Sequence, residues 1–197
     1  MAVIHKTTMV PSKRDLLTAW LPKQDWYAAK PEGPSLARVG GFRLDDPAGE
    51  VGIEFDVARD DAGAPVTAYL VPMTYRGNPL ADADAYLIGT AQHGVLGKRW
   101  IYDGTHDPVL LAQLAELIQG RVQAQAQSQS NTPDATVHAV PLNGAAGERL
   151  SVLFVRRLVP ADPAAVAEPG QVTGLWTAPD GALIRSVFAT ARPAPTR

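Results

Sequence analysis

The chain contains no cysteine and no long apolar run. The absence of cysteine excludes disulfide bonds and thiolate chemistry, and it suits a reducing cytoplasm. Residues 66–73 form one of the longest mostly apolar stretches, and it is far shorter than the roughly 20 residues of a membrane helix. Residues 1–6 lack the charged region and apolar run of a signal peptide. We therefore expect a cytoplasmic protein with no membrane partner.

Excess positive charge is also absent, because 18 Lys and Arg stand against 20 Asp and Glu. A net charge of -2 gives no long-range positive field, so we expect no nucleic-acid partner. The glycine-rich phosphate loop, the dinucleotide-binding turn, the hydrolase elbow and the zincin helix are also missing. What remains is a globular composition, with 46% apolar and 19% charged residues, in a chain long enough to bury a core.

Alternating apolar and polar residues predict antiparallel hairpins. The clearest alternation covers residues 50–57, in which the apolar set is Val51, Ile53, Phe55 and Val57. Residues 51–57 and 66–75 predict one hairpin, and residues 86–90 and 99–102 predict another. Residues 36–44 predict a strand in which Gly40-Gly41 marks a bulge. We expect the polar face with Glu54 and Asp56 to be solvated, and Pro72 to lie at a strand edge or end.

Two segments have helical spacing. The first follows Ser12, a capping residue, with Asp15 in its first turn. The second follows Asp107 and Pro108, and it places Leu110, Leu114, Leu117, Ile118 and Val122 on one face. This second segment is predicted to be the main, long core helix.

A polar tract over residues 124–133 marks a boundary. Beyond it, residues 136–142 with 150–159, and 172–177 with 182–190, predict two further hairpins. The predicted fold class is therefore α+β, a curved antiparallel β-sheet packed on a long helix and followed by a β-rich part of two hairpins. The predicted units are residues 1–125, residues 126–192 and a loose tail, residues 193–197.

Acid/base and metal chemistry has one concentrated candidate, formed by Asp103, His106 and Asp107. A carboxylate and an imidazole three residues apart could meet in a turn. A structural interpretation explains them better, because Asp107 stands where a helix cap belongs and Asp103-Gly104 is a turn dipeptide. The isolated His5, His93 and His138 suggest no ligand set, and we expect no catalytic, cofactor or metal residues.

Aromatic side chains offer a second kind of candidate site. Trp26, Tyr27, Trp100 and Tyr102 could stack on a sugar or line a peptide groove. Core packing is the alternative, and it is the better interpretation for Trp20.

Three ordered motifs resemble the N-terminal cap of maltokinases, also found in trehalose synthase-fused kinases. They are Trp20-Leu21-Pro22 with Trp26-Tyr27 and Lys30, then Tyr69 to Arg76 with Pro72, then Tyr102-Asp103-Gly104-Thr105-His106-Asp107-Pro108. The resemblance implies a cystatin-like cap. With the aromatic candidates, it gives a candidate ligand or partner surface of Trp26, Tyr27, Lys30, Arg76, Trp100, Tyr102, Asp103 and His106.

Past residue 125 the likeness to these kinases is partial. Residues 128–132 are similar to the loop that covers ATP, and residues 153–158 to a Lys-x-Phe-Arg-Arg-Leu strand, but the lysine position holds Leu153. Leucine cannot form the charge-assisted bonds that phosphoryl transfer requires. No His-x-Asp catalytic loop is present, and 197 residues leave no room for the large kinase lobe.

The resemblance therefore implies a non-catalytic, stand-alone cap protein without a cofactor. We expect it to bind or regulate another protein of α-glucan, maltose or trehalose metabolism. The alternatives are a sugar-binding protein that uses the exposed aromatics, and an enzyme centred on Asp103, His106 and Asp107.

Overall fold

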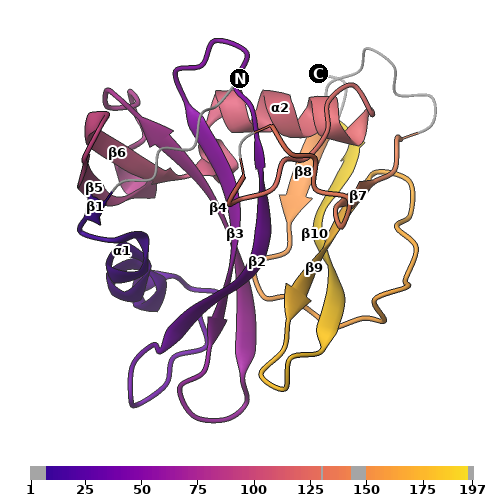
Figure 1. Cartoon of the computed structure of the whole chain (residues 1–197), viewed down its shortest axis with the longest axis horizontal. Coiled ribbons are helices and arrows are strands. Elements are labelled where there is room, and N and C mark those ends of the chain that lie inside the picture. Colours follow the sequence, from indigo (N-terminus) through magenta and orange to yellow (C-terminus); the bar gives the residue numbers. More distant parts are fainter. Residues whose placement is uncertain (1–7, 130, 143–149, 195–197) are drawn as a thin grey trace.

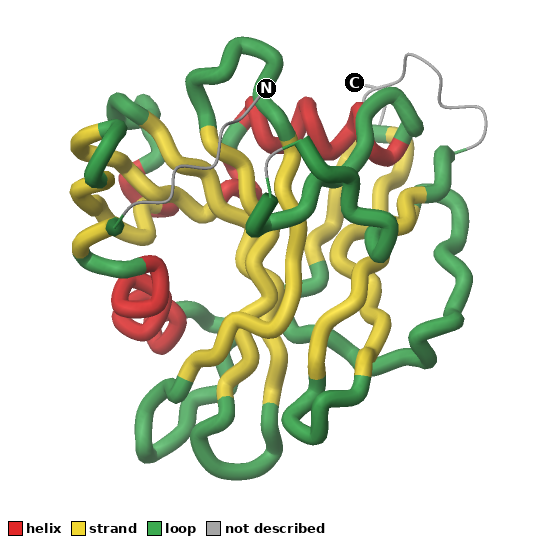
Figure 2. Tube along the Cα trace, viewed as in Figure 1, coloured by secondary structure: helices red, strands yellow, loops and turns green. Residues whose placement is uncertain are grey.

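A computed structural model describes residues 8–129, 131–142 and 150–194. The described residues form two α-helices and a ten-stranded sheet (Figures 1 and 2). The elements are β1 (Met9–Val10), α1 (Lys13–Trp20), β2 (Leu36–Leu44), β3 (Gly52–Asp60), β4 (Thr67–Arg76), β5 (Leu87–His93), β6 (Gly97–Asp103), α2 (Pro108–Ile118), β7 (His138–Ala139), β8 (Leu150–Phe154), β9 (Gln171–Thr177) and β10 (Leu183–Pro193). Three short 3-10 turns join them, at Leu21–Lys23, Asp84–Tyr86 and Gly104–His106. The class is α+β, as the sequence predicts.

The sheet curls until its pairing returns to β4. Its antiparallel order is β1-β5-β6-β4-β3-β2-β9-β10-β8, with β7 beside β9. After β8 the chain reaches β4, where the Leu70 amide donates to the Arg156 carbonyl at 3.0 Å and the Leu158 amide donates to the Ala68 carbonyl at 2.8 Å. The strands from β4 round to β8 thus enclose a first core, and α2 lies across one end of them (Figure 1).

A second core lies outside this enclosure, between α1 and β4 to β6. Leu17 and Trp20 of α1 pack there with Tyr69, Val71 and other buried apolar residues. Successive residues of a strand point to opposite faces, so β4 serves both cores, with Leu70 in the first and Tyr69 in the second.

Strand β3 confirms the alternation predicted for residues 51–57 and corrects its outer face. Ile53, Phe55 and Val57 belong to the first core. Glu54 and Asp56 point the other way but are not solvated, since their side chains are only 12% and 3% exposed. The expectation of a wet face is wrong because Lys13 of α1 covers both carboxylates.

A β-bulge confirms the irregularity predicted in β2 and explains how that strand serves two cores. The register with β3 shifts between Arg38 and Gly40. Before the shift Leu36 faces the second core, and after it Phe42 faces the first. An inserted residue moves later side chains to the other face.

Pro72 lies in the middle of β4, so the prediction of a strand edge or end is wrong. It pairs with Phe55 on one side. On the other side the Leu70 amide bonds the segment after β8, and β6 pairs only from Met73 onward. The backbone nitrogen of Pro72 faces the same edge of β4 as the Leu70 amide. It lies in the gap between the segment after β8 and β6, so the absence of an N–H group at Pro72 costs no hydrogen bond of the sheet.

Both predicted helix caps are present. The Ser12 hydroxyl accepts from the Asp15 amide, and the Asp107 carboxylate accepts from the Val109 amide at 2.9 Å. The expected long helix is wrong, because α2 has only 11 residues and the chain turns at Gly120, whose φ is +72°. No helix among the described residues is long and apolar enough to cross a membrane.

Of the two predicted C-terminal hairpins, one forms. Strands β9 and β10 pair with each other. The first prediction is wrong, because β7 pairs with β9 and β8 pairs with β10. The sheet also continues from β2 to β9 through Gly40 and Trp176, so residues on both sides of the predicted boundary share a sheet and a core. Residues 195–197 of the predicted tail lie outside the described residues.

Candidate functional site

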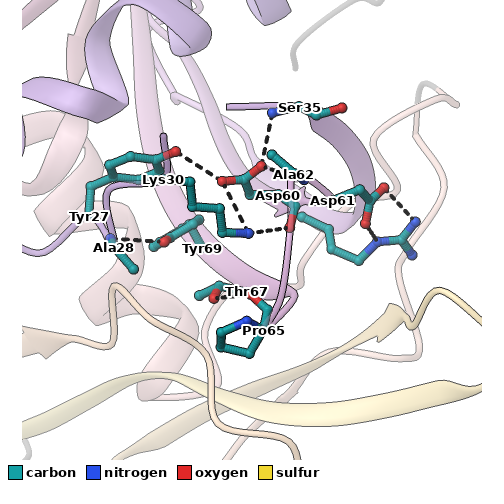
Figure 3. A network of polar contacts seen from close by, with 11 residues as sticks. Tyr27, Ala28, Lys30, Ser35, Asp60, Asp61, Ala62, Pro65, Thr67 and Tyr69 are labelled. Atoms are coloured by element: carbon teal, nitrogen blue, oxygen red, sulfur yellow. Dashed lines mark hydrogen bonds and ion pairs between the residues drawn. The ribbon is translucent and has the colours of Figure 1, made fainter. Parts of the chain in front are cut away.

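Two of the candidate residues, Tyr27 and Lys30, hold a buried carboxylate (Figure 3). The Tyr27 hydroxyl donates to Asp60 Oδ2 at 2.9 Å, and the Lys30 ammonium lies 3.6 Å from the same oxygen. The amides of Ser35 and Ala62 donate to Asp60 Oδ1 at 2.9 and 3.1 Å. Asp60 thus ties the loop before β2 to the end of β3.

The ionised form of Asp60 fits this setting. Burial by itself disfavours the charge, but the two amide donors, the Tyr27 hydroxyl and the Lys30 ammonium together hold the pKa of Asp60 below its usual value. Burial and the nearby Asp60 carboxylate raise the pKa of Tyr27. Tyr27 and Lys30 are therefore committed to the fold.

Arg76 is committed in the same way, to Asp107. Its Nε and Nη2 atoms lie 2.7 and 2.6 Å from the two carboxylate oxygens, and the Asp107 side chain is fully buried. Burial opposes ionisation, but the bonds from Arg76 and the Val109 amide hold the pKa of Asp107 below its usual value. This bidentate pair joins the end of β4 to the first turn of α2.

Asp103 is bound by Arg156, which approaches from the segment after β8. Arg156 Nη2 contacts Asp103 Oδ2 and lies 3.0 Å from the Thr105 hydroxyl. The Arg156 guanidinium also lies over the Trp26 ring, 5.0 Å from its centre. Its Nη1 atom is buried without a hydrogen-bond partner among the described residues.

These groups border an open groove of about 490 Å³, the Trp26–Arg156 groove. Trp26, Asp103 and His106 meet here, so the structure brings together three of the eight candidates. The His106 ring stacks on Tyr86 with centres 3.6 Å apart. The other lining residues are Lys23, Gln24, Asp25, Ala85, Thr105, Val152, Leu153, Phe154 and Arg156.

The four aromatic candidates do not form one stacking platform. Tyr27 and Tyr102 are buried, and the Tyr102 hydroxyl accepts from the Leu80 amide at 3.0 Å. Trp26 packs on the second core. Trp100 shares a strand face with Tyr102, opposite to Ile101 of that core, so Trp26 and Trp100 lie on different faces of the sheet.

Asp107 has a partner of its own, Arg76, whereas Asp103 and His106 share a contact. The Thr105 hydroxyl lies 3.0 Å from Asp103 Oδ1 and 3.1 Å from His106 Nδ1, and Asp103 also binds Arg156. Within the described part of the chain, no three His, Asp or Glu side chains are grouped to hold a metal ion. His138 is exposed on β7, His93 accepts from the Val95 and Leu96 amides, and His5 lies outside the described residues.

The comparison with known families bears on the same residues. Residues 20–107 match the family model of the maltokinase N-terminal cap domain. This part of the chain is similar to the maltokinase N-terminal cap domain, and it is called the cap domain below. The resemblance carried by the three motifs is thereby confirmed. No curated protein matches the chain.

The matched cap domain runs from Trp20, at the end of α1, to Asp107, the residue that caps α2. Arg156 lies beyond it, and sequence reasoning did not select Arg156 as a site residue. The available signal was its place in the Arg156-Arg157-Leu158 motif. Nothing local indicated that this motif would pair with β4, or that its arginine would reach Asp103.

Proposed function

We propose that this protein is non-catalytic and binds another protein of α-glucan, maltose or trehalose metabolism through the Trp26–Arg156 groove. The match to a maltokinase N-terminal cap domain supports the metabolic context. The groove supports the mode of action, because it is where cap-domain residues and the segment after β8 present side chains together.

The chemistry of the groove suits a protein partner. Trp, Tyr and Arg are the residues that most often dominate binding energy at protein interfaces, and Trp26, Tyr86 and Arg156 line this groove. Leu153 adds an apolar side chain that is 64% exposed. Charged Lys23 and Asp25 border these groups, as a polar rim borders an interface core.

The non-catalytic part of the proposal depends on Leu153 as well. At the position that the kinase resemblance gives to a phosphate-binding lysine, this side chain is apolar and faces outward. It offers no charge to a nucleotide phosphate and contributes apolar surface to the groove instead.

Affinity capture from a native lysate tests the proposal, with the parent protein and two variants as bait. Leu153→Asp places a charge in the groove. Leu183→Asp is the control, because it places the same charge outside the groove, at a leucine of β10 that is 54% exposed. We expect the parent and Leu183→Asp to recover an enzyme that acts on α-glucan, maltose or trehalose, and Leu153→Asp to lose it. Recovery of no such enzyme refutes the metabolic assignment. Equal recovery by Leu153→Asp refutes the groove as the contact.

A further inference from the structure

A cavity of about 350 Å³ lies between α1 and the outer face of β2 and β3, away from the groove. It is the α1 cavity, and its lining residues are Ser12, Lys13, Arg14, Leu17, Leu36, Ala37, Arg38, Asp56 and Ala58. Small-molecule sites have this size and this mixture, a mostly apolar wall with a few polar groups. Leu17, Leu36 and Ala58 are buried members of the second core, so the apolar part of the wall is formed by packed core side chains.

Asp56 gives the cavity an acceptor with spare capacity. Its side chain is 3% exposed, and its only hydrogen-bond donor among the described residues is the Lys13 ammonium, 3.4 Å away. That ammonium is bound more closely by Glu54, at 2.6 Å. An ionised carboxylate can accept about four hydrogen bonds, so Asp56 lacks donors.

The titration of Asp56 agrees with this geometry. Burial raises the pKa of Asp56 to about 6, although Lys13 and Arg38 oppose the rise. A buried acid with a displaced pKa in a cavity is a common mark of a binding site.

Arg14 and Arg38 provide the opposite charge. Both are exposed, and neither has an ion-pair partner among the described residues. Guanidinium groups with free donors bind carboxylates and phosphates well. Lys13 beside Asp56 disfavours a ligand cation at that carboxylate, so the donor that suits Asp56 is a neutral hydroxyl.

We propose that the α1 cavity binds a small organic anion that carries a hydroxyl group. The anionic group meets Arg38 and Arg14, and the hydroxyl donates to Asp56. The carbon skeleton packs on Leu17, Leu36 and Ala58. This site is independent of the partner proposed for the groove, and the anion can be a carboxylate or a phosphate.

Titration calorimetry with paired ligands tests the site and distinguishes the two anions. Mandelate and glycerol phosphate carry the hydroxyl, whereas phenylacetate and propyl phosphate lack it. We expect mandelate, glycerol phosphate or both to bind at millimolar concentration, each more tightly than its partner without the hydroxyl by about tenfold. No heat with either hydroxylated ligand, or equal affinity within both pairs, overturns the proposal.

Variants locate the binding. Arg38→Gln changes an exposed side chain and is expected to weaken binding about tenfold, whereas Arg192→Gln, at an exposed arginine of β10, leaves it unchanged. Asp56→Leu is expected to abolish the preference for the hydroxylated ligand. Thermal melting confirms that each variant is folded. Binding that survives Arg38→Gln at full strength places the ligand elsewhere and overturns the proposal.

Discussion

The guanidinium of Arg76 contacts both carboxylate oxygens of Asp107, while Asp107 also caps α2. Both residues belong to motifs of the cap domain. Their contact shows that these motifs bring the sheet and the helix together. A motif of charged residues in this domain is therefore not by itself a sign of a ligand site.

Asp107→Ala should cost more than the loss of a helix cap. Capping alone contributes about 1 kcal/mol, and breaking a buried ion pair leaves Arg76 without its partner, which brings the expected cost to about 3 kcal/mol. Urea unfolding measures the difference. Asp107→Asn is the control, because asparagine keeps the cap and loses only the charge, and it should cost less. If Asp107→Ala costs only about 1 kcal/mol, the ion pair contributes nothing to stability.

Local patterns were sufficient to predict the elements of the cap domain. The alternation through Ile53 and Phe55 predicted β3, and the Asp107-Pro108 pair predicted the start of α2. Adjacent strands in the chain formed hairpins because short turns leave them few other partners. Gly120 ended α2 earlier than the apolar spacing suggested.

Contacts between distant segments were not predictable from such patterns. Leu70 pairs with Arg156, and Asp103 binds the same arginine. Both contacts join the cap domain to a segment that is distant in the sequence. The prediction that the outer face of β3 is solvated fails for the same reason. Helix α1 covers Asp56 only when the second core has formed, and α1 is distant from β3 in the sequence. In the candidate site, Trp26 and His106 can be selected by residue type. Arg156 can be selected only when the segment after β8 is known to pair with β4.

The stability of the parent should depend on pH through Asp56. The pKa of Asp56 in the fold, about 6, lies above its value in the unfolded chain, so its favourable contribution is complete below about pH 4 and is lost as the pH rises through 6. Lys13 of α1, Glu54 of β3 and Arg38 of β2 are the charges that act on it. Asp56→Asn removes this titration.

Relative to the parent, Asp56→Asn should therefore gain stability between pH 4 and pH 7, on the order of 2 kcal/mol. Urea unfolding at a series of pH values measures the difference. A difference that stays constant, or that falls with rising pH, contradicts a raised pKa of Asp56 in the fold.

Gly41 should be irreplaceable, because the backbone of β3 passes close to it. Its φ is +119°, and a Cβ atom there would lie 2.0 Å from the Phe55 carbonyl oxygen. Gly41→Ala should cost more than about 3 kcal/mol. Gly33→Ala is the matched control, with φ at +72° and open space around the added atom, and it should cost about 1 kcal/mol. Equal losses in thermal melting would show that backbone strain, and not the contact with β3, determines the effect.

Magnesium-ATP should leave the melting temperature unchanged. A bound ligand stabilises a fold by RT ln(1 + [L]/Kd), which vanishes when Kd is far above the ligand concentration. Kinases hold the triphosphate with a lysine and with metal ligands, and here the corresponding strand position carries the exposed, apolar Leu153. Gln127 directly precedes residues 128–132, which resemble the loop that covers ATP. Its side-chain amide donates to Glu54 at 2.9 Å and is not free for a nucleotide.

Thermal melting with millimolar magnesium-ATP checks this expectation, with Leu153→Glu and Leu183→Glu as a matched pair of variants. Both replace an exposed leucine with a negative charge. Only Leu153 stands at the position that the kinase resemblance gives to the phosphate-binding lysine. The parent and both variants should melt alike with and without the nucleotide. A reproducible rise for the parent and Leu183→Glu that is lost for Leu153→Glu would establish a nucleotide site beside β8. The non-catalytic proposal would then fail, because a retained phosphate site has no place in a protein that acts only by contact.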